Sequence, residues 1–301
     1  MPEFAAFVPE ITADGSFTFY SSTFGEQFHS RKGARQEAAL KFVGPTQLRE
    51  KAKARSHLCL LDICYGLGYN TAVAVATIWA ANPHCHIELV ALELDPTVPL
   101  AALQIWQQFA IGADDRQQGV PWPEPVLKLL AGLVDRQTYQ SPQINAQLLL
   151  GDARQQLQTV RRSGFQADAI FLDPFSPPHC PQLWTMEFLD LAARCLCADG
   201  RLATYSCAAA VRHALLAANL QIAATPPIGR KSPGTIASWQ PLPEFPPLSS
   251  QEIEHLQTRA AIPYRDRTLS ASAEDILKRR ETEQQSSPLE PTSRWKKRWS
   301  T

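Results

Sequence analysis

The sequence lacks any apolar run of the roughly eighteen residues needed to cross a membrane, and it lacks an excess of charge of either sign. Its 29 lysines and arginines balance 29 aspartates and glutamates. The start, Met1-Pro2-Glu3-Phe4, has no basic segment followed by an apolar one. We therefore expect no membrane span and no signal peptide, and we predict a cytoplasmic location. The balanced charge and 45% hydrophobic content also exclude a disordered or strongly basic chain.

Cysteine is also sparse and unpatterned. The seven cysteines are an odd number and lie scattered through apolar segments, which favours buried reduced thiols over a disulfide framework. Cys195 and Cys197 form a C-x-C pair without a second pair nearby. This is not the spacing of a zinc site, and we expect no metal.

The 301 residues are enough for one substantial core or two modest ones. Short runs rich in Leu, Ile and Val alternate with longer amphipathic segments, a pattern typical of a parallel sheet covered by helices. We therefore predict an α/β fold with a Rossmann-like sheet and helices on both faces. The predicted strands are 58–63, 87–92, 148–150, 169–172 and 202–205, with 221–224 and 235–239 as a final, antiparallel pair.

Three parts are predicted along the chain. Residues 1–55 contain Asp14-Gly15 between alternating apolar positions, which indicates a β-hairpin, and then a basic helix near 33–43. Residues 56–240 form the core, in which 111–145 exceed a normal connection and predict an insertion over one sheet edge. Residues 241–301 lose the strand pattern and read as a helical appendage with a basic, tryptophan-containing tail.

A glycine turn follows the first core strand, in the run Leu61-Asp62-Ile63-Cys64-Tyr65-Gly66-Leu67-Gly68. Glycine lets the backbone approach a ligand closely, and the helix that follows presents unpaired N–H groups. Taken alone, this motif also fits a tight strand-to-helix turn with no ligand. A dinucleotide site would need a third glycine, which is absent where Thr71 stands, so an adenosine without a pyrophosphate fits better.

Two carboxylates follow the next two strands. Glu93 ends the second strand, where an acidic side chain can accept hydrogen bonds from both ribose hydroxyls, although a helix-capping acid is the alternative. Asp152 follows the third strand at the same carboxyl edge. Three strand ends therefore surround one predicted crevice.

The fourth strand ends at Asp173 and leads into a loop with four prolines. The prolines stiffen the mouth of the crevice, and the ring of Phe175 between them could stack on a base or shield a cation. An amine with a pKa of about 10 is protonated in solution, so its methylation needs an acceptor for the proton. We predict that Asp173 is this catalytic carboxylate; a loop acid that caps the next helix is the alternative.

These motifs resemble the S-adenosylmethionine-dependent methyltransferases of the MnmC type, which complete 5-methylaminomethyl-2-thiouridine at the tRNA wobble position. The resemblance runs from about Thr12 to Ile236. It is carried by Asp14-Gly15-Ser16, Tyr20-Ser21, Glu26, Phe28-His29-Ser30, Gly33-Ala34, Glu37, Gly66-x-Gly68-x-Asn70, Glu93, Gly151-Asp152, the Asp173-x-Phe175-Ser176-Pro177-x-x-x-Pro181-x-x-Trp184 loop and Gly229-Arg230-Lys231.

The resemblance implies a sandwich around a seven-stranded sheet with one antiparallel edge strand. It implies that Gly66, Gly68, Asn70, Glu93 and Asp152 bind S-adenosyl-L-methionine, with Asp173 beside the aminomethyl group. The predicted substrate-binding residues are Phe175, Pro177, Trp184, Arg230, Lys231, Glu26 and His29, although His29 is equally compatible with a structural role. The bifunctional relatives carry a flavin-dependent oxidase that 65 residues after Ile236 cannot hold, so we expect the stand-alone version. The expected partners are tRNA and the enzymes that install the aminomethyl group.

The net charge of zero is the sum of two basic stretches and an acidic remainder. Residues 31–55 carry a net charge of +6 and residues 278–301 a net charge of +4, against −10 on the rest. The end, Arg294-Trp295-Lys296-Lys297-Arg298-Trp299, interleaves cations and rings, a combination suited to phosphate contact and base stacking. A solvated or packed tail is the alternative. We predict that tRNA contacts both stretches.

Two other functions stay open at this point. One is a methyltransferase of the same fold that acts on a small-molecule or protein amine. The other is a non-catalytic RNA-binding protein that has kept the fold.

Overall fold

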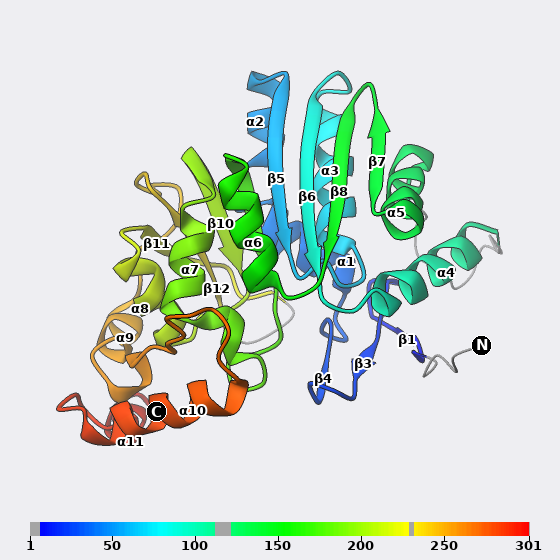
Figure 1. Ribbon diagram of the computed structural model, residues 1–301. Helices are drawn as coiled ribbons and strands as arrows, with labels where there is room; N and C mark the ends of the chain where they lie inside the picture. The colour runs from blue at the N-terminus through cyan, green and yellow to red at the C-terminus, as the bar shows by residue number, and fades with distance from the viewer. Residues whose placement is uncertain (1–6, 112–121, 229–231, 301) are drawn as a thin grey trace.

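The computed structural model describes residues 7–111, 122–228 and 232–300, and its centre is a mixed, eight-stranded sheet (Figure 1). The strand order is β11-β12-β10-β9-β5-β6-β8-β7. Strands β8, β6, β5, β9 and β10 are parallel to one another. The strands are β5 (His57–Ile63), β6 (His86–Glu93), β7 (Thr138–Ser141), β8 (Ile144–Leu150), β9 (Ala167–Leu172), β10 (Leu196–Thr204), β11 (Gln221–Thr225) and β12 (Gly234–Ser238).

The α/β prediction is confirmed, but the expected seven-stranded sheet is wrong in two details. β12 runs antiparallel between β10 and β11 rather than at an edge, and β7 adds an eighth, antiparallel strand beside β8. The segment TYQS of β7 is short and polar, with no buried residue. It therefore carries little of the apolar alternation from which strands are predicted.

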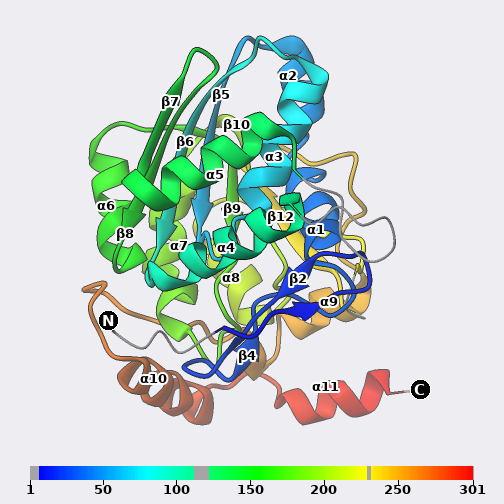
Figure 2. The same ribbon diagram turned by 90° about the vertical axis from the view of Figure 1, so that its right-hand side faces the viewer.

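Helices cover both faces of the sheet, as predicted (Figures 1 and 2). The central strand β9 is buried along its whole length, as a parallel strand between two helical layers must be. In β5, Leu58 and Leu60 join one apolar cluster, whereas Leu61 and Ile63 join the other. The first cluster includes α2 (Leu48–Ala54), α3 (Tyr69–Ala81), α4 (Thr97–Ile111) and α5 (Glu124–Arg136); the second includes α6 (Ala153–Arg162), α7 (Met186–Ala193) and α8 (Ala209–Ala217).

The N-terminal segment lies near the carboxyl ends of the parallel strands (Figure 1). The hairpin predicted around Asp14-Gly15 is present as β1 (Glu10–Ile11) paired with β2 (Phe17–Thr18). A second small pair consists of β3 (Tyr20–Ser21) and β4 (Glu26–Gln27). The helix predicted near 33–43 is α1 (Ala34–Glu37), which continues as a π-helical turn, Ala38–Val43.

The C-terminal segment folds into α9 (Ser250–His255), α10 (Ala273–Ser286) and α11 (Thr292–Trp299). In α11, Trp295 stacks on His255 with ring centroids 4.1 Å apart, and Arg298 pairs with Glu254 and Glu290. The tail is therefore packed against α9 rather than extended. The division of the chain into three parts stays a prediction.

None of the helices in the described ranges 7–111, 122–228 and 232–300 has the length and apolar character that a membrane crossing requires.

One buried carboxylate inside the core makes the stability of the fold depend on pH. Asp62 in β5 is fully buried; its Oδ2 accepts the Thr71 hydroxyl at 2.7 Å, and its Oδ1 has no hydrogen-bond partner among the described residues. Burial raises the pKa of Asp62 to about 7. Because the folded state holds a proton that the unfolded state releases near pH 4, stability falls as the pH rises from about 4 to about 7.

We predict that Asp62→Asn removes this dependence. Relative to the variant, the wild-type protein should lose on the order of 4 kcal/mol of unfolding free energy over that pH range. Urea unfolding at pH 4 and pH 8 measures the difference, and the exposed Asp135→Asn is the matched control. A difference between wild type and Asp62→Asn that does not change with pH would contradict the burial argument.

Candidate active site

A cavity of about 170 Å³ lies at the carboxyl ends of the parallel strands. It is bounded by the ends of β5, β6, β8 and β9, by the proline-rich loop after β9 and by the N-terminal segment around β4. The cavity thus brings together segments that are far apart in the sequence. Of the residues predicted for the site, seven line it: Gly66, Glu93, Asp152, Asp173, Phe175, Glu26 and His29.

The glycine turn brings the backbone up to the cavity wall. Cys64, Gly66 and Gly68 have φ values of 70°, 55° and 83°, the left-handed region that favours glycine. A Cβ at Gly68 would also lie 2.7 Å from the Tyr65 hydroxyl. Gly66 lines the cavity, but Gly68 does not. The structure therefore supports a role of Gly68 in the turn rather than in direct ligand contact.

Glu93, at the end of the neighbouring strand β6, holds the glycine turn in place by accepting hydrogen bonds. Its Oε2 accepts the Gly66 N–H at 2.8 Å, and its Oε1 accepts the N–H groups of Leu94 and Asp95 at 2.7 and 2.9 Å. The side chain is buried except at the cavity, and burial raises its pKa. A carboxylate can accept about four hydrogen bonds, so Glu93 has capacity left for a donor in the cavity.

Asp152 is held by residues that the sequence did not single out. It caps α6 by accepting the Arg154 N–H, and both its oxygens also bind the Arg154 guanidinium. The same guanidinium donates at 2.8 Å to Asp266, whose side chain is 1% exposed, and at 2.9 Å to the carbonyl of Ala271. The C-terminal segment therefore fixes a carboxylate at the cavity. No sequence signal links Asp266 to a residue 112 positions earlier.

Asp173 lines the cavity at the end of β9, and Asn70 of α3 holds it. The Asn70 Nδ2 donates to Asp173 Oδ2 at 3.0 Å, while the Asp173 N–H donates to the carbonyl of Ile63. Asn70 is 4% exposed and does not line the cavity. It was predicted to bind the cofactor; its contact in the structure is instead with the predicted catalytic carboxylate.

Ring contacts and hydrogen bonds from other segments hold the proline-rich loop in place. The ring of Phe175 stacks on Phe24 with centroids 4.4 Å apart and meets the Phe28 ring edge-on at 5.0 Å. Glu26 accepts the N–H and hydroxyl of Ser176, so this predicted substrate residue already holds the loop. Tyr205 donates to the carbonyl of Pro174. The loop therefore presents a fixed aromatic wall.

Two residues of this loop that were predicted to bind the substrate do not line the cavity. Trp184 is fully buried and donates its Nε1–H to the carbonyl of Phe175 at 2.8 Å. Pro177 is buried and does not line the cavity. The hydrogen bond of Trp184 supports the loop; that Trp184 and Pro177 bind the substrate stays a prediction.

The π-helical turn supplies a buried ion pair at the cavity. Lys41 is 1% exposed and lies 3.3 Å from Glu37, which also accepts the Ser30 N–H. Both side chains line the cavity. Glu37 is one of the residues that carry the family resemblance, whereas no pattern in the sequence indicates that Lys41 points inward rather than to solvent. His29 also lines the cavity, with its ring edge-on to Tyr69 at 5.1 Å.

The basic stretch 31–55 is not one exposed surface. Lys41 and Lys51 are buried, Arg35 lies 3.7 Å over the ring of Trp122, and Arg55 pairs with two aspartates. Only half of the eight basic side chains are therefore exposed, namely Arg31, Lys32, Arg49 and Lys53. Arg230 and Lys231 lie outside the described residues.

The cavity as a whole favours a cationic ligand with hydroxyl groups. Five acidic and two basic residues line it, an excess of three carboxylates. Aromatic rings from Phe28 and Phe175 cover another wall. Rings and carboxylates together attract a cation.

Comparisons with known proteins agree with this geometry. A family described as S-adenosyl-L-methionine-dependent methyltransferase matches residues 123–240. The crystal structure of MnmC2 from Aquifex aeolicus superposes with a TM-score of 0.78 at 33% identity, over 95% of this chain and 87% of that one. An uncharacterized protein of Methanocaldococcus jannaschii is 29% identical over 90% of this chain and 70% of its own length.

Bifunctional proteins are similar as well. The tRNA 5-methylaminomethyl-2-thiouridine biosynthesis bifunctional protein MnmC of Azoarcus sp. is 32% identical over 71% of this chain. The match covers 33% of that protein, so the chain spans about a third of the length of the bifunctional relatives.

The residues at the cavity fit the cofactor of this family. S-adenosyl-L-methionine carries a sulfonium cation and two ribose hydroxyls, and the cavity offers excess carboxylate and a buried Glu93 with capacity for one further donor. The chain belongs to the MnmC-type family of S-adenosyl-L-methionine-dependent methyltransferases.

Proposed function

We propose that this protein methylates the amino nitrogen of a 5-aminomethyl-(2-thio)uridine at the tRNA wobble position. The observation that carries the proposal is the Asn70–Asp173 pair, which holds a carboxylate at the cavity between the glycine turn and the aromatic loop. The substrate class is that of the bifunctional relatives, which are tRNA 5-methylaminomethyl-2-thiouridine biosynthesis proteins. tRNA and the enzymes that install the aminomethyl group are then the partners, and the cytoplasm is the location.

The roles assigned to the cofactor-binding residues follow from their contacts. Glu93 accepts a hydroxyl group with its remaining capacity while it holds the Gly66 turn in place. Asp152, fixed by Arg154, is a second acceptor at the cavity edge. Gly66 allows close approach of the backbone, and Gly68 makes the turn possible. When bound, S-adenosyl-L-methionine supplies a methyl group on a positively charged sulfur.

At the acceptor side, Asp173 accepts an N–H of the substrate amine and orients its lone pair. Transfer of the methyl group to this nitrogen would break the carbon–sulfur bond, leave its electron pair on the sulfur as a neutral thioether, and leave the nitrogen with one proton to lose. The nitrogen then loses a proton, for which Asp173 is the nearest proposed acceptor. Asn70 acts as a positioning residue, because it touches Asp173 and does not line the cavity. Phe175 supplies a flat wall for a base, and His29 and Glu26 complete the rim.

The test uses the purified chain, methyl-labelled cofactor and three acceptor pools: tRNA from cells that lack this protein, total protein, and small-molecule extract. We expect label in tRNA, recovered after digestion as 5-methylaminomethyl-uridine. Label confined to protein or small molecules would instead identify another amine as acceptor. Cofactor binding without turnover on any pool would indicate a non-catalytic RNA-binding protein.

A further inference from the structure

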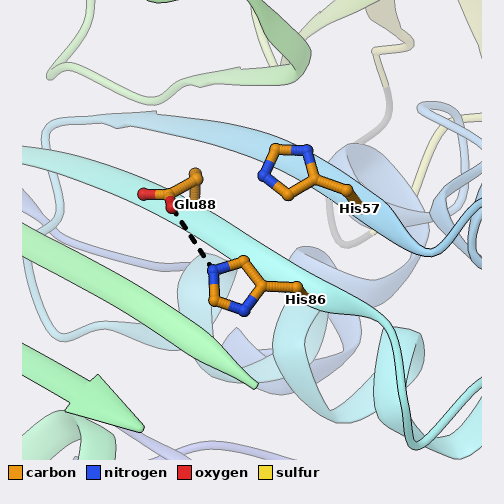
Figure 3. Close-up of side chains that lie close together, drawn as sticks. All are labelled: His57, His86 and Glu88. Atoms are coloured by element: carbon orange, nitrogen blue, oxygen red, sulfur yellow. Dashed lines mark hydrogen bonds and ion pairs between the residues drawn. The ribbon is translucent and has the colours of Figure 1, made fainter. Parts of the chain in front are cut away.

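A second cluster of polar side chains lies at the opposite end of the sheet from the cavity. His57 and His86 are the first residues of β5 and β6, and the register pairs them with each other. Glu88 follows two positions later on the same face of β6 (Figure 3). The cavity lies at the other end of these strands, about 20 Å away at 3.3 Å per residue.

These three side chains converge on one point. The ligand atoms of His57, His86 and Glu88 all lie within 4.8 Å of one another. The two rings are nearly parallel, with centroids 5.6 Å apart, and His86 Nε2 is 3.3 Å from Glu88 Oε1. Figure 3 shows the rings and the carboxylate on the same side of adjacent strands.

The neighbours of His86 determine which of its ring nitrogens can bind a metal ion. Its Nδ1 lies 3.0 Å from the carbonyl oxygen of Pro142, which can only accept, so Nδ1 carries a hydrogen. Nε2 faces Glu88 and forms an ion pair with it when the ring is protonated; in the neutral ring Nε2 is the nitrogen that offers a lone pair, so a metal ion bound here would replace that proton. Asn145 of β8 donates to Glu88 at 2.8 Å and lies 3.4 Å from His86 Nε2. A carbonyl that fixes the tautomer of a histidine is the usual outer partner of a metal ligand.

A neighbouring cluster shows the contrasting case. Asp168, Cys197 and Asp199 also lie within 4.8 Å of one another, but Arg55 pairs with both aspartates and Lys51 with Asp199. A protein cation already balances that cluster. Among the ion pairs of residues 7–111, 122–228 and 232–300, Glu88 pairs only with His86.

We propose that His57, His86 and Glu88 form a binding site for a divalent transition-metal ion of the zinc class. Two imidazoles and one carboxylate suit Zn²⁺, and also Co²⁺ or Ni²⁺, better than Mg²⁺ or Ca²⁺. Water molecules fill the remaining ligand positions of the ion. The Cys59 thiol, 4.0 Å from His57 Nδ1, is close enough to be a further ligand. The bound ion joins β5 to β6 and stabilises the folded chain, with no part in methyl transfer. His57 and His86 are 29 positions apart, so no short spacing motif in the sequence indicates this site.

The test is a titration of the full chain, freed of metal by a chelator, with Zn²⁺ and, in parallel, with Co²⁺. We expect saturable binding of one ion per chain, a rise in the unfolding temperature, and Co²⁺ absorption bands typical of nitrogen and oxygen ligands. His57→Ala and His86→Ala should each weaken binding at least about tenfold. The matched control is His84→Ala, an exposed histidine outside the cluster, and Mg²⁺ should produce no shift.

Absence of saturable binding, or equal Zn²⁺ affinity in wild type and His57→Ala, would overturn the proposal. If His86→Ala did not fold, the exposed His57 would still give a decisive variant, because its removal leaves the core untouched. Methyl transfer by His57→Ala, measured without added metal, should match the wild type. Failure of the metal site is thereby distinguishable from failure of the proposed function.

Discussion

Asp173→Asn should lower the rate of methyl transfer by about 10²–10⁴-fold, the range typical of a lost general base, and leave cofactor affinity nearly unchanged. The asparagine oxygen can still accept from Asn70, so the local geometry at the end of β9 persists. What is lost is the negative charge that orients and deprotonates the amine. Single-turnover assays with labelled cofactor measure the rate, and calorimetry of the product cofactor measures the affinity.

The matched control for this substitution is Asp190→Asn on α7, where the carboxylate is 43% exposed and pairs with Arg194. It should retain the wild-type turnover. Unchanged turnover in Asp173→Asn as well would remove Asp173 from the mechanism. The Asn70→Ala variant separates positioning from chemistry, because it should lower kcat while the pH profile of the reaction keeps its shape.

Glu93→Gln should produce the largest effect on cofactor binding, a loss of about 10–100-fold in affinity. Glutamine cannot accept at its amide nitrogen, so either Gly66 or the Leu94 and Asp95 N–H groups lose their acceptor. That loss is present with and without ligand; what changes on binding is the hydrogen bond from a ribose hydroxyl to the charged carboxylate, worth about 1.5–3 kcal/mol, which corresponds to this change in affinity. Equilibrium binding of the product cofactor is the direct measurement.

The exposed Glu124→Gln of α5 is the control for this effect, and its affinity should equal that of the wild type. In steady-state assays the Glu93→Gln defect should raise the KM for S-adenosyl-L-methionine, whereas Asp173→Asn lowers kcat. Wild-type cofactor affinity in Glu93→Gln would show that the carboxylate serves only to hold the turn.

The strand ends at the site were predictable because a parallel sheet brings its carboxyl ends to one edge. Gly66, Glu93, Asp152 and Asp173 each follow a recognisable apolar run, so their proximity follows from the topology alone. The sequence cannot specify which neighbours hold them. Arg154 reaches Asp266 only because the C-terminal segment folds back on α6 and α7.

The net charge of residues 31–55 overstates the basic surface that this segment exposes. The net +6 of residues 31–55 treats Lys41 and Lys51 as surface cations, but both are buried: Lys41 pairs with Glu37, and Lys51 donates to the carbonyl oxygens of Asp168 and Asp199. Composition records only the charge, and burial depends on the face of the helix that meets the core. Contact between tRNA and the exposed remainder, Arg31, Lys32, Arg49 and Lys53, stays a prediction.

The ion pairs that link Asp152 through Arg154 to Asp266 couple ligand binding at the cavity to the stability of the 266–271 turn. Suppose that a ligand at the cavity binds more tightly when Arg154 is paired with Asp152. Because coupling between two sites is reciprocal, the bound ligand then stabilises the 266–271 turn against local opening by the same free energy. Amide hydrogen exchange at Ser270 and Ala271, whose N–H groups both donate to Asp266, should then slow when cofactor binds. The far end of the chain would thus report occupancy of a pocket that it does not line.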